Sequence, residues 1–152
     1  MKIGEALSRL KKEKSRLARL ISLRKENIFI EEGKTQKFDP IKLTKDIDSK
    51  IEEIRTLKIS IQRVNLETKV VGEEITLAEA IIKISDIRSK LSQLSCLFDK
   101  KKDIWYKSKD EKELIAQMSE NDVEDMIEQL EIEKSQLDNK VQITNWTAKL
   151  NE

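Results

Sequence analysis

Apolar residues recur every three or four positions through four stretches of the chain, which is the spacing of one face of an α-helix. The first stretch predicts an amphipathic helix over residues 3–28, which a polar connection at residues 31–37 ends. The second predicts a helix from Asp39-Pro40 to about Asn65, because Asp caps helix starts well and Pro fits the first helical turn. The pattern is typical of an all-α protein.

The third stretch carries the most regular pattern. It opens with Thr76-Leu77-Ala78-Glu79, a capping box in which the Thr side chain caps the helix and the Glu side chain reaches back. A helix over residues 76–98 is therefore predicted, with two apolar rows that repeat every seven positions for three heptads. The rows are Leu77, Ile84, Leu91 and Phe98, and Ala80, Ile87 and Leu94.

After the third stretch the periodicity stops, and we expect a short irregular insert or a β-hairpin near residues 103–118. A last helix is predicted to begin near Ser119 or Asn121 and to end near Trp146. No internal sequence repeat is apparent across the four stretches. We therefore expect a single domain over residues 1–152, made of long antiparallel helices that form a helical bundle or coiled coil.

The apolar stripes are too wide to stay in water, because burying one Leu or Ile is worth about 1.5–3 kcal/mol. Helices of this length leave elongated apolar seams, so we expect copies of the chain to self-associate through them. Three charged residues, Lys14, Arg24 and Lys134, fall in register with the stripes, where a charge restricts register or its stem extends to solvent. The residues expected in the self-association seam are Ile47, Ile54, Ile61, Leu77, Ile84 and Leu91.

Charge is distributed unevenly, although 30 Lys and Arg nearly balance 29 Asp and Glu. Residues 1–30 carry nine basic and three acidic side chains, whereas residues 111–138 carry two basic and ten acidic ones. These opposite fields favour the first and last helices lying beside each other, within one subunit or across an interface. Each exposed pair is worth only about 0.2–1 kcal/mol, so charge selects partners without driving folding.

Composition argues against catalysis and bound cofactors. The chain has no His, one Cys and three Gly, which removes the usual general base and zinc ligand and the glycine-rich phosphate loops. Cys96 has no His or second Cys to work with and is expected to be an ordinary helix residue. The acidic run from Glu120 to Glu128 lacks EF-hand spacing and favours a solvated face over a metal site. We expect no catalytic residue, no cofactor and no metal.

The basic first helix raises nucleic-acid and membrane binding as alternatives. A near-neutral chain without aromatic residues in that helix disfavours nucleic acid. A basic amphipathic helix suits a membrane surface, but the bundle needs its apolar face. No apolar run approaches the ~20 residues that span a bilayer and no signal peptide is evident, so we expect a cytoplasmic protein. The residues that would meet phosphates are Lys11, Lys12, Arg16 and Arg19.

The C-terminal residues resemble those of a known family. The segment 137–147 reads L-D-N-K-V-Q-I-T-N-W-T and is similar to the closing L-D-x-x-I-Q-x-x-N-W-T signature of the septicolysin-like family of small bacterial helical proteins. The segments 63–65 and 72–80 resemble that family's central stretch, although Ile81 stands where the family usually has Leu. The family-motif residues in this chain are Asn65, Asp138, Asn145 and Trp146.

This resemblance implies an all-helical protein without established enzymatic activity. From the apolar seams and the lack of a catalytic constellation, we expect a non-enzymatic structural or protein-interaction module that forms homo-oligomers. The family's name implies a membrane-acting cytolysin as the alternative. A pore former that inserts needs a long apolar or alternating segment, and the sequence has neither.

Overall fold

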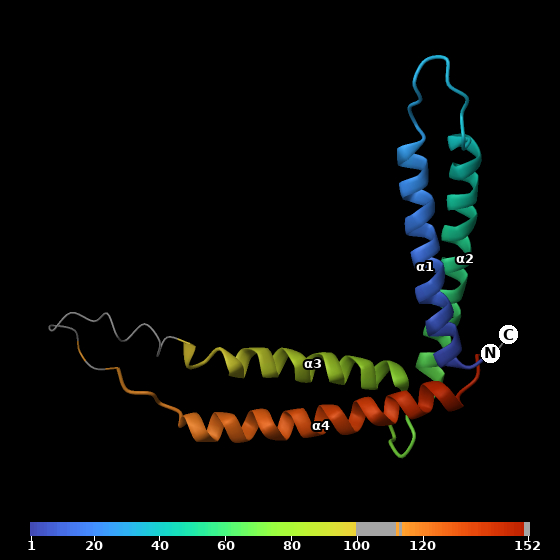
Figure 1. Ribbon diagram of the computed structural model, residues 1–152. Coiled ribbons are helices and arrows are strands. Elements are labelled where there is room, and N and C mark those ends of the chain that lie inside the picture. Colours follow the sequence, from blue (N-terminus) through green and yellow to red (C-terminus); the bar gives the residue numbers. More distant parts are fainter. Residues whose placement is uncertain (100–111, 113, 151–152) are drawn as a thin grey trace.

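Figure 1 presents the computed structural model of the chain, which describes residues 1–99, 112 and 114–150. This part contains helices and no strand, so the predicted all-α class is confirmed. The insert expected near residues 103–118 falls mostly outside the described residues, and residues 114–118 form neither helix nor strand. The helices are α1 (Ile3–Glu26), α2 (Pro40–Glu67), α3 (Leu77–Ser95) and α4 (Glu120–Thr147).

The helices pair as two antiparallel hairpins. α1 packs along α2, and α3 packs along α4. The hairpins diverge as the two arms of an L, and both chain ends lie at its corner (Figure 1). We call this corner the vertex: residues 1–6, 64–80 and 141–150. α1 and α4 meet at the vertex but do not lie side by side along their length, so of the two predicted arrangements the one within a subunit is wrong and the one across an interface stays a prediction. Burial of apolar stripes decides the pairing, because it outweighs surface charge.

The predicted helix starts are confirmed for α2 and α3. The amide of Ile41 donates to the carboxylate of Asp39 (2.9 Å), with Pro40 in the first turn. At α3 the amide of Glu79 donates to Thr76 Oγ1 (3.2 Å), and the amide of Thr76 donates to Glu79 Oε2 (2.6 Å). These bonds satisfy amide groups that a helix leaves without internal partners.

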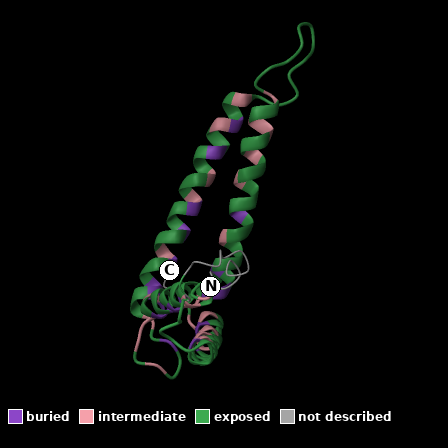
Figure 2. Ribbon diagram, turned by 90° about the vertical axis from the view of Figure 1, so that its left-hand side faces the viewer, coloured by how far each residue is buried: buried purple, intermediate pink, exposed green. Residues whose placement is uncertain are grey.

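Buried residues lie along the first arm between its two helices and gather at the vertex (Figure 2). Ile3 and Leu77, the first residues of α1 and α3, are fully buried there. Closure of each hairpin covers the predicted self-association seam, because five of its six residues are buried within the chain and Leu91 is half-buried. We therefore reassign the seam from a surface between copies to the intrachain core. The buried five are Ile47, Ile54, Ile61, Leu77 and Ile84.

The two hairpins are joined by reciprocal backbone hydrogen bonds. The amide of Ile3 donates to the carbonyl of Ala148 (3.1 Å), and the amide of Leu77 donates to the carbonyl of Thr68 (2.8 Å). The start of α1 is thus bonded to the residue that follows α4, and the start of α3 is bonded to the residue that follows α2. Exchanging the two hairpins exchanges these bonds, which is the signature of an internal twofold relation.

This relation reveals a structural repeat that is not apparent in the sequence alone. The two isolated antiparallel bridges, Lys2 with Lys149 and Thr76 with Lys69, make Lys2 equivalent to Thr76 and Lys69 equivalent to Lys149. In that alignment Q-x-x-N-x-x-x-K at 62–69 matches the same pattern at 142–149. The repeated residues are few and the connections within the hairpins differ in length, which hides the repeat in the apolar pattern.

Candidate functional site

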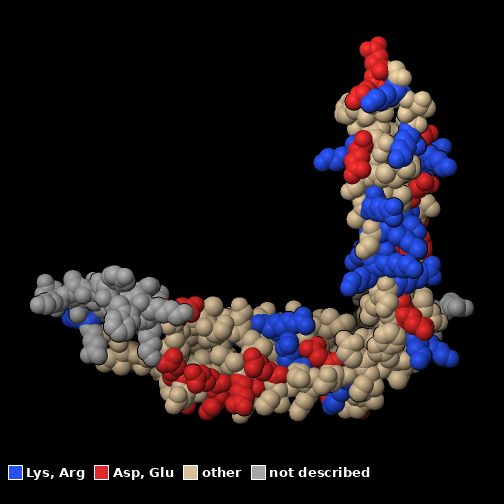
Figure 3. All heavy atoms as spheres, in the orientation of Figure 1, with Lys and Arg blue, Asp and Glu red and all other residues tan. Residues whose placement is uncertain are grey.

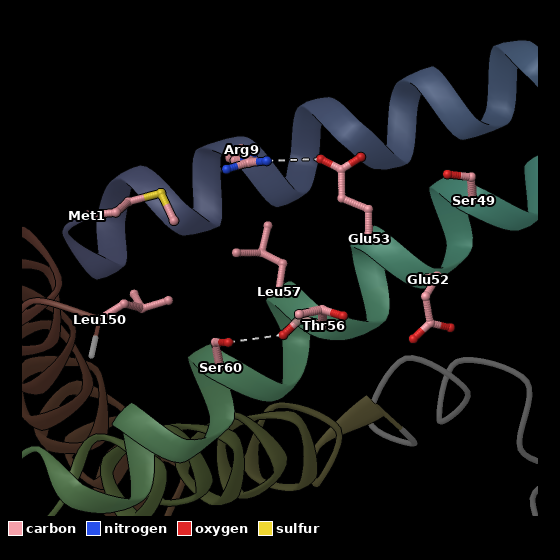
Figure 4. A pocket seen from close by; sticks show the side chains of 9 residues that line it. All are labelled: Met1, Arg9, Ser49, Glu52, Glu53, Thr56, Leu57, Ser60 and Leu150. Carbon is pink, nitrogen blue, oxygen red and sulfur yellow. Dashed lines mark hydrogen bonds and ion pairs between the residues drawn. The ribbon is translucent and has the colours of Figure 1, made fainter. Parts of the chain in front are cut away.

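A shallow cleft of about 430 Å³ opens beside the vertex, between α1 and α2. Figure 4 shows its side chains, which come from both helices and from the C-terminal segment. An apolar part is contributed by Met1, Leu57 and Leu150, next to a polar part formed mainly by α2. The polar lining residues are Arg9, Ser49, Glu52, Glu53, Thr56 and Ser60.

The polar groups of this cleft are held by protein partners. Glu53 accepts from Lys50 Nζ (2.6 Å) and from Arg9 Nη2 (3.0 Å), and these two cations, Lys50 foremost, lower the pKa of Glu53. Ser60 Oγ donates to the backbone carbonyl of Thr56 (3.1 Å). An ionised carboxylate between two cations accepts hydrogen bonds and does not donate a proton at neutral pH.

A buried ion pair continues from the cleft into the first hairpin. The Glu13 side chain is 5% exposed and accepts from Lys50 Nζ (2.8 Å) and Arg16 Nη1 (2.8 Å). The hydrogen bond from Lys50 is the main cause of the lowered pKa of Glu13, although burial acts in the opposite direction. Glu13, and after it Glu53, raises the pKa of Lys50. Lys50 thus links α1 to α2 through charge-assisted hydrogen bonds.

Sequence reasoning missed Glu13. Of the neighbouring pair it singled out Lys14 as the charge in the stripe, but Lys14 is exposed and Glu13 is buried. The spacing indicates that Glu13 belongs to the apolar row of this helix, because it lies three residues after Leu10 and four before Leu17. A glutamate in an apolar row requires a buried cation as partner.

The second hairpin repeats the outer ion pair and replaces the inner one. Lys83 Nζ lies 2.8 Å from Glu133 Oε1, at the positions equivalent to Arg9 and Glu53 in the internal repeat, and Glu133 raises the pKa of Lys83. The positions equivalent to Glu13 and Lys50 hold Ile87, which is buried, and Leu130, which is half-buried. The first hairpin therefore carries an ion pair at a level where the second carries apolar residues.

Further contacts tie the arms together at the vertex. A Cβ built on Gly4 would lie 2.8 Å from Trp146 Cδ2, so the absence of a side chain at Gly4 lets the indole ring pack on α1. The amide of Val71 donates to Thr144 Oγ1 (3.0 Å), and Lys140 Nζ lies 2.5 Å from Glu73 Oε1. The connection between the hairpins is thereby attached to α4, which restricts the angle between the arms.

Most of the family-motif residues gather at this vertex. Asn65 is buried near the end of α2, and Asn145, its equivalent in the repeat, is half-buried near the end of α4. Trp146 covers Gly4 and remains 51% exposed. Asp138 lies farther along α4 and pairs with Lys134 at 3.6 Å. The motif therefore consists mainly of residues that join the two hairpins.

The remaining candidates lie on the surface. Cys96 is exposed and follows the last residue of α3. Among the described residues, no three His, Cys, Asp or Glu side chains come close enough to hold a metal ion. None of the described helices combines the length and apolarity that crossing a bilayer requires. Basic residues mark the arm of α1 and α2, and acidic residues line α4 (Figure 3).

These features define an all-α protein of two repeated helical hairpins joined at a vertex. The chain belongs to the family of unknown function DUF6847, whose profile matches residues 10–150. Its fold is similar to the crystal structure of a functionally unknown conserved protein from Corynebacterium diphtheriae, with a TM-score of 0.85 and 25% sequence identity over 99% of each chain. The comparison with curated proteins gave no match. The septicolysin-like resemblance stays a prediction.

Proposed function

We propose that the protein is a non-enzymatic helical interaction module whose two arms bind protein surfaces, and that it self-associates. The observation that carries this proposal is the size of its surface. The chain exposes 12143 Å², whereas a compact monomer of 17.7 kDa exposes about 7,900 Å². The surplus of about 4,000 Å² exceeds the roughly 1,600 Å² that a standard protein interface buries.

The self-association uses the outer faces of the arms, because the heptad rows are covered within the chain. Large apolar side chains are available on those faces: Ile82 of α3 is 61% exposed and Ile132 of α4 is 50% exposed. The contacts that tie the arms at the vertex support this role, since arms restrained before binding lose less freedom when a partner binds. The exposed Cys96 suits a reducing compartment, which favours the cytoplasm.

The proposal of a non-enzymatic role is supported by the cleft beside the vertex. Both carboxylates that line it are ion-paired: Glu52 with Arg55, and Glu53, whose pKa is lowered, with Lys50 and Arg9. The hydroxyl of Ser60 is used in a bond to the backbone of its own helix. These side chains stabilise the hairpin and offer a substrate neither a general base nor an activated nucleophile.

Light scattering coupled to size-exclusion chromatography tests the proposal. We expect a mass of at least twice 17.7 kDa for the full chain at micromolar concentration. A clean monomer under these conditions contradicts self-association. An elongated monomer elutes from the column as early as a compact dimer does. The measurement is therefore the mass from light scattering and not the elution volume.

Membrane action is the second candidate, and one observation favours it. The connection between α1 and α2, at the far end of the first arm, carries Phe29 at 87% exposure, with Ile28 and Ile30 more than half exposed. Apolar side chains at a loop tip are able to enter the headgroup region of a bilayer. Dye release from liposomes separates the two functions: an interaction module releases none, and release that Phe29→Ser abolishes supports membrane action.

A further inference from the structure

The two arms carry opposite charge on helices of similar length. α1 contains eight basic and three acidic residues, and α4 contains eight acidic and two basic ones. At 1.5 Å per residue the two helices are about 36 and 42 Å long. Figure 3 shows basic side chains gathered over the lower part of the first arm and acidic ones along the second.

Part of this charge is already paired within the chain. Arg9 and Arg16 are bound to Glu53 and Glu13. Exposed side chains remain without an ion pair in the described residues on both arms. We define the basic face as Lys11, Lys12 and Arg19 of α1, and the acidic face as Glu124, Glu128 and Glu131 of α4.

Both faces follow helical spacing. Lys12 and Arg19 are seven residues apart, and so are Glu124 and Glu131, so each pair lies two turns apart on one side of its helix. Glu124 and Glu128 share that side at a spacing of four. Two straight rows of opposite sign and similar length are complementary when they lie alongside one another.

One chain cannot bring these faces together, because α1 and α4 belong to arms that diverge from the vertex (Figure 1). A second copy can do so. The internal twofold relation exchanges the first hairpin with the second. A copy rotated in this way, and displaced so that it stacks against the first copy instead of coinciding with it, lays its acidic arm over the basic arm of the first copy. The same rotation places its basic arm on the acidic arm, and the pair closes with two identical contacts.

We propose that two copies of this chain associate with the basic face of α1 in each copy against the acidic face of α4 in the other. This inference rests on the self-association proposed above and names its surface. Charge sets the orientation and accelerates encounter. Apolar contact comes from exposed residues of the same faces, among them Ile132 of α4.

Charge-reversed variants of the full chain test the pairing. The α1-reversed variant combines Lys11→Glu, Lys12→Glu and Arg19→Glu, and the α4-reversed variant combines Glu124→Lys, Glu128→Lys and Glu131→Lys. All six side chains are exposed, so circular dichroism should show unchanged helix content. The matched control combines Lys42→Glu, Lys45→Glu and Lys58→Glu, which changes the charge of the same arm on exposed positions of α2.

We expect each reversed variant to lose dimer affinity by about tenfold or more, because like charges then face each other. An equal mixture of the two variants should restore the dimer, since every contact again joins opposite charges. The α2 control should keep the wild-type mass. Sedimentation velocity or light scattering at two salt concentrations measures these outcomes, and wild-type association should weaken as salt rises.

The possible results separate the failure of the proposed interface from the failure of self-association itself. If the wild-type chain is a dimer and both reversed variants dimerise equally well, the charged faces are not the interface and self-association through another surface stands. If the wild-type chain is a monomer, both proposals fail. If the basic face instead shifts a labelled oligonucleotide while α1 reversal leaves the mass unchanged, the face binds nucleic acid and the inference is wrong.

Discussion

Lys50 Nζ lies 2.8 Å from the carboxylate of Glu13, at the level where the second hairpin holds Leu130 and Ile87. The first hairpin therefore buries a charged residue in an apolar row, and the internal repeat supplies the apolar alternative. An ion pair taken out of water loses hydration that its mutual attraction only partly returns. The pair fixes the register of α1 against α2, whereas an apolar pair tolerates small shifts.

Replacing Glu13 and Lys50 by the residues at the equivalent positions of the second hairpin tests this relationship. We expect Lys50→Leu alone to lower the urea midpoint of unfolding, because it leaves Glu13 buried without its main partner. The double variant Glu13→Ile with Lys50→Leu should unfold at a midpoint equal to or above that of the wild-type chain. A double variant less stable than Lys50→Leu alone would contradict the equivalence of the two hairpins.

The same residues predict how stability depends on pH. Lys50 lowers the pKa of both Glu13 and Glu53 from the ordinary value of 4.5. A carboxylate with a lowered folded pKa stabilises the fold above the unfolded value and loses this contribution as pH falls through the folded pKa. We therefore expect the urea midpoint to fall as pH drops below about 4.5. The Glu13→Gln variant should show a shallower fall, and a parallel profile would exclude Glu13 as a source.

The contact between Gly4 and Trp146 involves a second pair of residues that can be replaced by the pair at the equivalent positions of the repeat. Gly4→Ala places a methyl group 2.8 Å from the indole ring, and overpacking of this kind costs about 1–3 kcal/mol in the free energy of unfolding. In the repeat the equivalent positions hold Ala78 and Leu66. The double variant Gly4→Ala with Trp146→Leu should recover most of the loss in denaturant titrations. Equal loss in the single and double variants would show that the contact is not the cause.

The helix starts provide a fourth prediction with an internal control. Thr76→Ala removes the acceptor for the amide of Glu79, and loss of such a cap costs about 1 kcal/mol. Ser119 precedes α4 without a side-chain cap bond, so Ser119→Ala should change the free energy of unfolding by less than half as much. Thermal and urea unfolding of the two variants measure the difference, and equal losses would contradict the assigned capping.

Burial along α3 gives a fifth prediction. Ile84 is 5% exposed, whereas Ile82 on the same helix is 61% exposed. Ile84→Ala should lower the free energy of unfolding by about 2–5 kcal/mol, because it removes buried methylene groups and leaves a cavity. Ile82→Ala should change it by under about 0.5 kcal/mol. If Ile82→Ala instead lowers the mass measured by light scattering, Ile82 contributes to contact between copies.

The candidate site was less predictable than the fold. Asp39 and Thr76 act through bonds to residues two and three positions away, so local spacing was sufficient to place them. The cleft beside the vertex joins Met1, Leu57 and Leu150, which are far apart in the chain. Their meeting depends on how the hairpins are tied, and no local pattern encodes it.

By itself, the sequence determined the four helices, the N-caps of α2 and α3 and the residues that must leave water, because periodicity and capping act within a few positions of the chain. Only the tertiary structure decided that Ile47 and Leu77 are covered within one chain rather than by a second copy. It also decided that the basic and acidic helices point apart. An apolar stripe shows that a helix must pack against a partner. Which helix becomes the partner depends on long-range packing at the vertex, where Ile3 and Leu77 close the core.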